Sequence, residues 1–124
     1  CGIIPDVFLV LNNMYLEFEK YNDILITAFI GELDHSSAEE VRIKVDDRID
    51  RYYISKVILN FSKVTFMDRS GIGAVVGRYK KIKNKGGNLC IAGTSKNVDK
   101  IFELAGLYKL INKYDTVDEA VSCI

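Results

Sequence analysis

The sequence of 124 residues contains no tryptophan, one histidine (His35), one proline and three cysteines. The cysteines, Cys1, Cys90 and Cys123, are widely spaced and form no C-x-x-C pair, so neither a disulfide framework nor a zinc site is expected. A single histidine leaves few ligands for any other metal centre. Scattered, unpaired cysteines are typical of a reducing compartment, and we expect a cytoplasmic protein.

The chain also lacks an excess of charge and any long apolar run. Lysine and arginine together number 17, as do aspartate and glutamate, so no long-range field would attract nucleic acid or an anionic membrane surface. No stretch approaches the roughly 18 uninterrupted apolar residues of a membrane span. With 48% hydrophobic and 27% charged residues, the composition is that of one globular domain.

The first 13 residues do not fit the pattern that follows them. They contain an apolar run at 7–11, but no basic residue precedes it and no small-residue cleavage site follows it, so a signal peptide is not indicated. A regular strand pattern begins at Met14. We therefore predict that residues 1–13 are an N-terminal extension or derive from cloning and lie outside the fold, and that residues 14–124 form the domain.

From Met14 the apolar residues change period repeatedly, as in alternating strands and helices. Residues 14–31, with a turn signal at 21–23, predict a hairpin of two strands. The other expected elements are a helix from the capping boxes at 36–40, a buried strand at 56–61, a helix between Asp68 and Gly86, a buried strand at 89–92, a helix between Ser95 and Gly106, an edge strand at 110–111 and a short helix from Thr116. This order predicts an α/β domain whose mostly parallel or mixed sheet has four to five strands, with about four helices.

Two loops of the predicted fold are candidates for a functional site. Ligands and partners of open α/β sheets bind at the carboxyl ends of the strands, where helix N-termini point outward. Residues 31–36 and 65–73 both fall there. The first loop contributes Asp34 and His35 to the candidate rim, and the second contributes the four residues Asp68, Arg69, Ser70 and Gly71. Either Ser70 or Asp68 can cap the helix that follows.

Enzymatic and nucleotide-binding interpretations of these loops find little support. The pair Gly71 and Gly73 resembles a dinucleotide fingerprint, but Val76 stands where the third small residue belongs, and no phosphate-binding P-loop is present. A hydrolase triad of His35, Asp68 and Ser70 is disfavoured because two of its members are only two residues apart and no G-x-S-x-G elbow exists. We expect Gly73, with Gly77 one turn later, to let the helix approach the sheet closely.

A basic stretch at 78–85 is the one local anomaly of charge. Arg78, Lys81 and Lys85 share a helical stripe, which predicts a solvated helix face near the negative end of the helix dipole. The alternative is a nucleic-acid patch involving Lys80, Lys81 and Lys85, for which binding would depend strongly on salt.

Four motifs then occur in an order and spacing that resemble a known family. They are GELDH at 31–35, VTFMDRSGIG at 64–73, GRYK at 77–80 and FELAGL at 102–107. Together they resemble the STAS-domain anti-sigma factor antagonists, and most nearly the sporulation anti-anti-sigma factors. The likeness extends from Met14 to about Ile124. It implies a single STAS-type domain that acts by protein–protein contact in the regulation of transcription, with no catalytic activity and no cofactor or metal.

The resemblance also implies the partners. Members of this family bind an anti-sigma factor that is also a serine kinase, and so release the sigma factor that it holds. The kinase phosphorylates the antagonist on a serine at the N-terminus of the second helix, which abolishes binding, and a serine phosphatase restores it. A phosphate adds about −1.5 to −2 charges, here to a rim that already carries Asp34 and Asp68.

This sequence departs from the family at the position that matters most. The acceptor serine follows the aspartate of the motif, and here that position is Arg69, with Ser70 in the second place. Three hypotheses stay open: a constitutive antagonist that cannot be switched off, an antagonist with altered or lost kinase binding, or a phosphoacceptor moved to Ser70. We rank the last lowest, on the expectation that the Ser70 hydroxyl caps the helix.

The predicted partner-binding surface is the rim of Asp34, His35, Asp68, Arg69, Ser70 and Gly71. We expect neither direct nucleic-acid binding nor membrane binding. An alternative role for such a module is in a stress-signalling complex or a lipid-transport system. The lone-domain length and the GRYK motif favour the sigma-factor branch.

Overall fold

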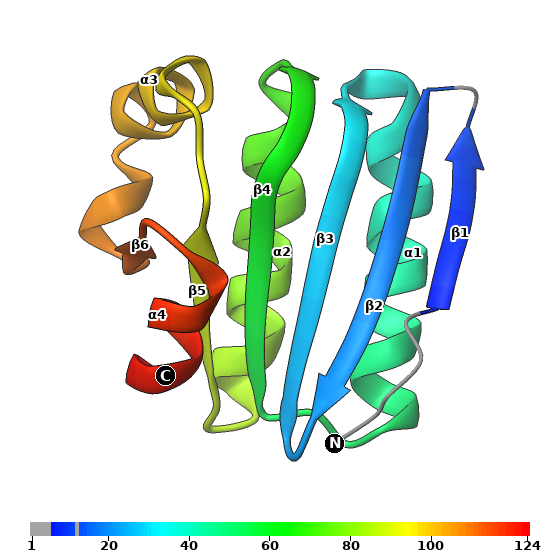
Figure 1. Ribbon diagram of the computed structural model, residues 1–124, viewed down its shortest axis with the longest axis vertical. Helices are drawn as coiled ribbons and strands as arrows, with labels where there is room; N and C mark the ends of the chain where they lie inside the picture. Colours follow the sequence, from blue (N-terminus) through cyan, green and yellow to red (C-terminus); the bar gives the residue numbers. More distant parts are fainter. Residues whose placement is uncertain (1–5, 12) are drawn as a thin grey trace.

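The computed structural model describes residues 6–11 and 13–124. Its centre is a six-stranded sheet in the order β1-β2-β3-β4-β5-β6 (Figure 1). The strands are β1 (Asp6–Leu11), β2 (Met14–Tyr21), β3 (Ile24–Leu33), β4 (Lys56–Met67), β5 (Asn88–Ala92) and β6 (Lys113–Tyr114). The helices are α1 (His35–Arg51), α2 (Ser70–Asn84), α3 (Lys96–Leu104) and α4 (Val117–Cys123), with a short 3₁₀ helix, η1, at Leu107–Lys109.

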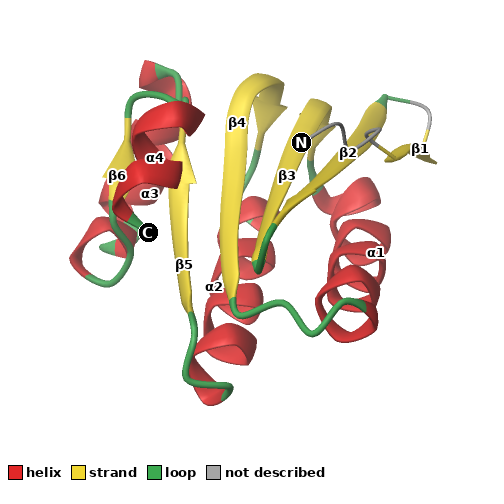
Figure 2. Ribbon diagram, turned by 60° about the horizontal axis from the view of Figure 1, so that its bottom comes forward, coloured by secondary structure: helices red, strands yellow, loops and turns green. Residues whose placement is uncertain are grey.

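The sheet is mixed, as predicted. The β1, β2 and β3 strands are antiparallel neighbours, whereas β3, β4, β5 and β6 run parallel. Parallel neighbours require crossover connections, which α1, α2 and α3 supply. The α1 and α2 helices cover one face of the sheet, and α4 packs on the other (Figures 1 and 2). The predicted fold class is therefore confirmed, with six strands in the sheet instead of four or five.

The two additional or displaced strands lie at the edges of the sheet. Residues 6–11 were expected outside the fold, but they form β1, which pairs antiparallel with β2; residues 1–5 of the predicted extension lie outside the described residues. The predicted edge strand at 110–111 is also wrong. Ile111 is buried in the core, and the strand lies two residues later at Lys113–Tyr114. The β6 strand has only two residues, too few for a periodic pattern. The β1 strand coincides with the apolar run at 7–11, which is continuous and shows no alternation that would mark it as part of the sheet.

A core of aromatic and branched side chains fills the space between the sheet and its helices. Phe61 of β4 lies between Phe29 of β3 and Phe102 of α3, with ring centroids 5.0 and 5.3 Å apart. On α1, the apolar residues Val41, Val45 and Ile49 recur at helical spacing and are buried against the sheet. Contacts of this kind fix the position of each helix on the sheet, and hence of the loops that precede the helices.

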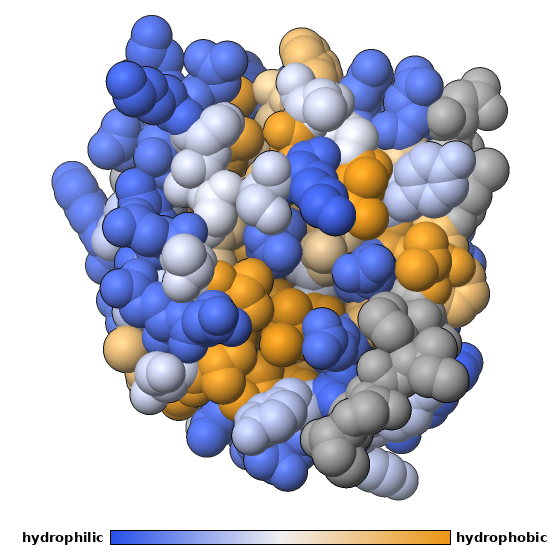
Figure 3. Space-filling view, in the orientation of Figure 1, coloured by the Kyte–Doolittle hydropathy of each residue, from blue (hydrophilic) through white to orange (hydrophobic). Residues whose placement is uncertain are grey.

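A smaller apolar cluster lies on the opposite face beneath α4. Ile24, Ile58, Cys90 and Ala120 are its buried members, and apolar surface remains visible beside α4 in Figure 3. Burial raises the pKa of the Cys90 thiol to about 12. The thiol is therefore protonated at neutral pH and behaves as a small hydrophobic group.

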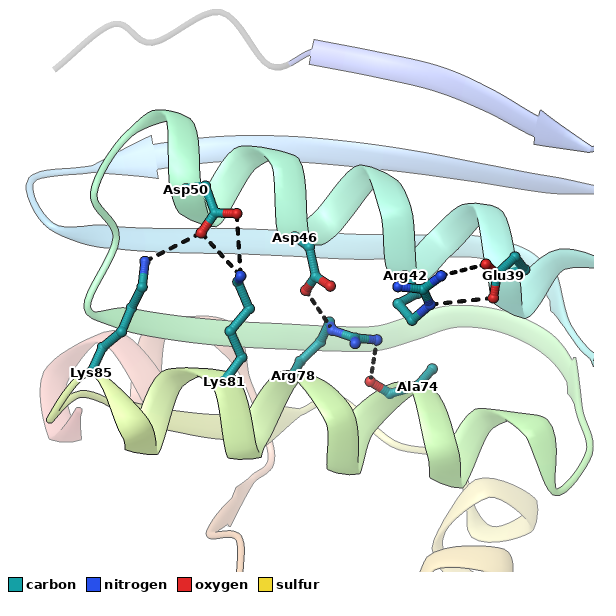
Figure 4. A network of polar contacts seen from close by, with 8 residues as sticks. All are labelled: Glu39, Arg42, Asp46, Asp50, Ala74, Arg78, Lys81 and Lys85. Atoms are coloured by element: carbon teal, nitrogen blue, oxygen red, sulfur yellow. Dashed lines mark hydrogen bonds and ion pairs between the residues drawn. The ribbon is translucent and has the colours of Figure 1, made fainter.

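The basic stripe of α2 faces α1 and pairs with carboxylates there, which corrects the interpretation of it as a purely solvated face (Figure 4). The Arg78 guanidinium is buried and forms an ion pair with Asp46 at 2.8 Å. Lys81 and Lys85 both approach the Asp50 carboxylate, at 3.0 and 3.4 Å. These three cations are therefore paired within the fold and form a seam between two helices, which argues against the nucleic-acid alternative. No helix in the described parts of the chain is long and apolar enough to cross a membrane.

Candidate functional site

The first loop of the rim is a helix cap built on Asp34. Asp34 Oδ1 accepts hydrogen bonds from the backbone N–H groups of Ser36 and Ser37, at 3.0 and 3.1 Å. In return, Ser37 Oγ accepts from the Asp34 N–H at 3.1 Å, which completes a capping box. The helix therefore begins at His35 with Asp34 as its N-cap, just before the two overlapping capping boxes that we expected at 36–40.

These bonds also set the charge state of the cap. The hydrogen bond from the Ser36 hydroxyl, at 2.7 Å, and those from the backbone lower the pKa of Asp34. A carboxylate whose pKa is lowered by folding stabilises the native state at neutral pH. That contribution is lost as the pH falls through the folded-state pKa of the group. Asp34 is therefore negatively charged at neutral pH and contributes this charge to the rim.

The second loop is joined to the first by the side chain of Asp68. Asp68 Oδ1 accepts from the Ser70 N–H at 2.7 Å, and its Oδ2 accepts from the His35 N–H at 3.2 Å. One carboxylate thus satisfies a free N–H at the start of both α1 and α2. Residues 33 positions apart in sequence are held side by side, and the two loops form one continuous surface.

Arg69 and Ser70 lie on this surface with their side chains uncommitted. Arg69 is exposed, has helical backbone angles and makes no side-chain capping bond. Ser70 is the first residue of α2. The sequence indicated either Ser70 or Asp68 as the cap of this helix, and the structure shows that the Asp68 carboxylate is the cap. Within the described chain, neither the Arg69 guanidinium nor the Ser70 hydroxyl makes a hydrogen bond or ion pair. We ranked Ser70 last among the acceptor hypotheses on the expectation that its hydroxyl caps the helix, and that expectation is wrong.

Gly71 differs from the rest of the rim because it is buried. A Cβ atom at Gly71 would meet Cγ and Sδ of Met67 at 2.6 Å and Leu33 Cδ2 at 3.4 Å, so α2 begins in close contact with the strand ends. At Gly73 and Gly77 a Cβ would have no neighbour within 4 Å. The close approach that we expected at these two glycines occurs at Gly71 instead.

Substitution by alanine should change the stability of the protein in opposite directions at the crowded Gly71 and at the open Gly73. We expect Gly71→Ala to lower the free energy of unfolding by about 1–2 kcal/mol, because the buried Met67 side chain must move. Gly73→Ala should raise it by up to about 1 kcal/mol, because alanine is the better helix former and has room. Urea denaturation of both variants measures the difference. Equal stability of the two variants would contradict this packing.

The geometry gives little support to catalysis at the rim. His35 reaches Asp68 through its backbone N–H, not its imidazole. Both Asp68 oxygens accept backbone N–H groups, and the Ser70 hydroxyl has no imidazole partner among the described residues. The proton relay of a hydrolase is therefore not assembled. In the same described residues, no group of three or more His, Cys, Asp or Glu side chains could hold a metal ion.

Comparison with known proteins relates this arrangement to one family. The family model described as "STAS domain" matches residues 15–120. The chain is 34% identical over 110 residues to an anti-sigma F factor antagonist of Paenibacillus polymyxa, a match that covers 89% of this chain and 94% of that protein.

Two solved structures extend the similarity to the fold. The unphosphorylated form of the anti-sigma factor antagonist SpoIIAA superposes with a TM-score of 0.76 at 30% identity, over 86% of this chain and 93% of that one. The phosphorylated form of SpoIIAA from Bacillus superposes with a TM-score of 0.70 at 29% identity, over 86% of this chain and 96% of that one.

Proposed function

This chain belongs to the STAS domain family, and we propose that it is an anti-sigma factor antagonist that binds an anti-sigma factor with serine kinase activity. By occupying that partner it releases a sigma factor, and so regulates transcription without contacting DNA. The observation that carries this proposal is the 34% identity to an anti-sigma F factor antagonist across 94% of that protein's length. The proposal assigns the protein to the cytoplasm and gives it no catalytic activity.

We propose that the partner binds at the rim of Asp34, His35, Asp68, Arg69 and Ser70, with Gly71 supporting it from beneath. Asp68 ties the two loops together, so the surface is preorganised and little ordering entropy is lost on binding. The two aspartates offer negative charge to the partner, and Arg69 offers one exposed cation.

The charge of this rim favours an antagonist that stays in its binding form. Asp34, Asp68 and Arg69 together carry a charge of about −1 at neutral pH, whereas a phosphoserine in place of Arg69 would bring it to about −3.5 to −4. Arginine therefore keeps the rim close to the charge of an unphosphorylated serine form, about −2, and far from that of the phosphorylated form. Of the three hypotheses for Arg69, constitutive antagonism agrees best with this charge.

Binding and covalent modification can be measured in one experiment. The protein is mixed with the anti-sigma kinase of its source organism, with ADP or with ATP, and titration calorimetry is followed by intact mass spectrometry. We expect tight binding with either nucleotide and no added phosphate. Absence of binding with both nucleotides would contradict the proposed function. A phosphate located on Ser70 would refute constitutive antagonism and show that the acceptor has moved by one residue.

A further inference from the structure

The C-terminal half of β4 has a free edge. β4 pairs with β3 along its length, up to Met67 opposite Leu33, but β5 pairs with it only as far as Ala92 opposite Asn60. The chain then leaves the sheet toward α3 (Figure 1). A Cβ on Gly93 would meet Ser62 Cβ at 3.0 Å, so the connection still contacts β4 at that point. Beyond Asn60, no strand among the described residues pairs with this edge of β4.

A groove of 340 Å³ separates this free edge from α3. The β4 wall consists of the four residues Val64, Thr65, Phe66 and Met67, and the α3 wall of Ser95, Asn97, Val98, Lys100 and Ile101. Phe66 is 52% exposed, although a phenylalanine in a strand is usually well buried. Of these described lining residues, only Lys100 is charged.

Lysine side chains lie in and beside the groove. Lys63 precedes the β4 wall and Lys96 begins α3, and both are exposed. Two acidic residues adjoin the groove in sequence, and both are engaged within the fold. Asp99 accepts hydrogen bonds from Thr94 and Tyr108 and pairs with Lys113. Asp68, directly after Met67, accepts two backbone N–H groups. An acidic and partly apolar segment would therefore complement this groove.

From these observations we infer that the groove receives an extended segment of the anti-sigma factor as an added strand on β4. An unpaired strand edge offers a row of backbone N–H and C=O groups, and an extended peptide satisfies them by strand addition. An apolar side chain of the segment packs on Phe66, and a carboxylate approaches Lys100. The groove ends at Met67, directly before Asp68 and Arg69, so it continues the rim. This inference rests on the proposed function and adds a second contact to it.

Two variants and two matched controls test the groove. Phe66→Ala and Lys100→Glu change exposed side chains of the groove, whereas Leu104→Ala and Lys109→Glu change exposed side chains that do not line it. Titration with the anti-sigma factor should show affinity reduced about tenfold or more for each groove variant. Each control variant should bind within about twofold of the unchanged protein.

Hydrogen exchange supplies a readout that is independent of substitution. On addition of the anti-sigma factor, backbone amides within 64–67 should exchange more slowly, because the added strand accepts hydrogen bonds from this edge. If the unchanged protein binds, but both groove variants bind equally well and no amide of 64–67 is protected, the groove inference is wrong and the proposed function stands. If the unchanged protein does not bind at all, both fail.

Discussion

Arg69→Ser is expected to convert the protein into a substrate of its anti-sigma kinase. Position 69 is exposed at the start of α2, and within the described chain the Arg69 side chain makes no hydrogen bond or ion pair that serine would lose. A hydroxyl there is free to accept a phosphate. The phosphate would add about −1.5 to −2 charges beside Asp34 and Asp68. Like charges at an interface cost several kcal/mol, so we expect roughly 100-fold or greater loss of affinity on phosphorylation.

Intact mass and peptide mapping after incubation with ATP, followed by calorimetry of the purified phosphoform, measure both effects. Arg69→Ala is the matched control, because it removes the cation without adding a hydroxyl. We expect it to stay unmodified and to bind in the presence of ATP. Phosphorylation of the alanine control would show that the acceptor is another residue, and unchanged affinity of the phosphorylated serine variant would contradict the electrostatic argument.

Asp68→Ala is expected to be the most destabilising substitution at the rim. It removes two hydrogen bonds that cap helices, one to Ser70 N and one to His35 N. Each cap contributes about 1 kcal/mol, and loss of the link between the loops adds to it, so we expect a decrease of about 2–3 kcal/mol in the free energy of unfolding. The two loops would also separate, so affinity for the anti-sigma factor should fall.

Denaturant unfolding and calorimetry of the same samples measure these two losses. Asp68→Asn retains one oxygen acceptor and should lose about half as much stability. Asp115→Ala serves as the control, since that exposed side chain makes no hydrogen bond or ion pair within the described chain. A decrease below about 0.5 kcal/mol for Asp68→Ala, comparable to an ordinary surface substitution, would exclude a structural role for the carboxylate.

Elements with strong local signals were predicted closely. Ser95 caps α3 through the Val98 N–H, and Thr116 caps α4 through the Glu119 N–H. The α2 helix ends before Gly86, and Gly106 has the positive φ that follows α3. Each signal depends on a few consecutive residues, so sequence alone reveals it. The strand before each loop located both loops approximately, although β4 continues to Met67, beyond the strand expected at 56–61.

Features that depend on residues far apart in sequence were missed or misread. Helical periodicity predicts a solvated face for the stripe of Arg78, Lys81 and Lys85, because it does not reveal that α1 presents Asp46 and Asp50 to these side chains. The bond from the His35 N–H to Asp68, which joins the two loops, cannot be read from either loop alone. Likewise, the close approach at Gly71 depends on the Met67 side chain beneath it.

The sequence by itself determined the fold class, the order of β2 to β5 and of the four helices, and the two loops that form the rim, because periodicity and capping act over short distances along the chain. Only the tertiary structure decided which charges are paired, which helix cap joins α1 to α2, and where the edge of β4 is left free. These depend on the packing of segments that are distant in sequence, and their partners are defined only once the chain has folded.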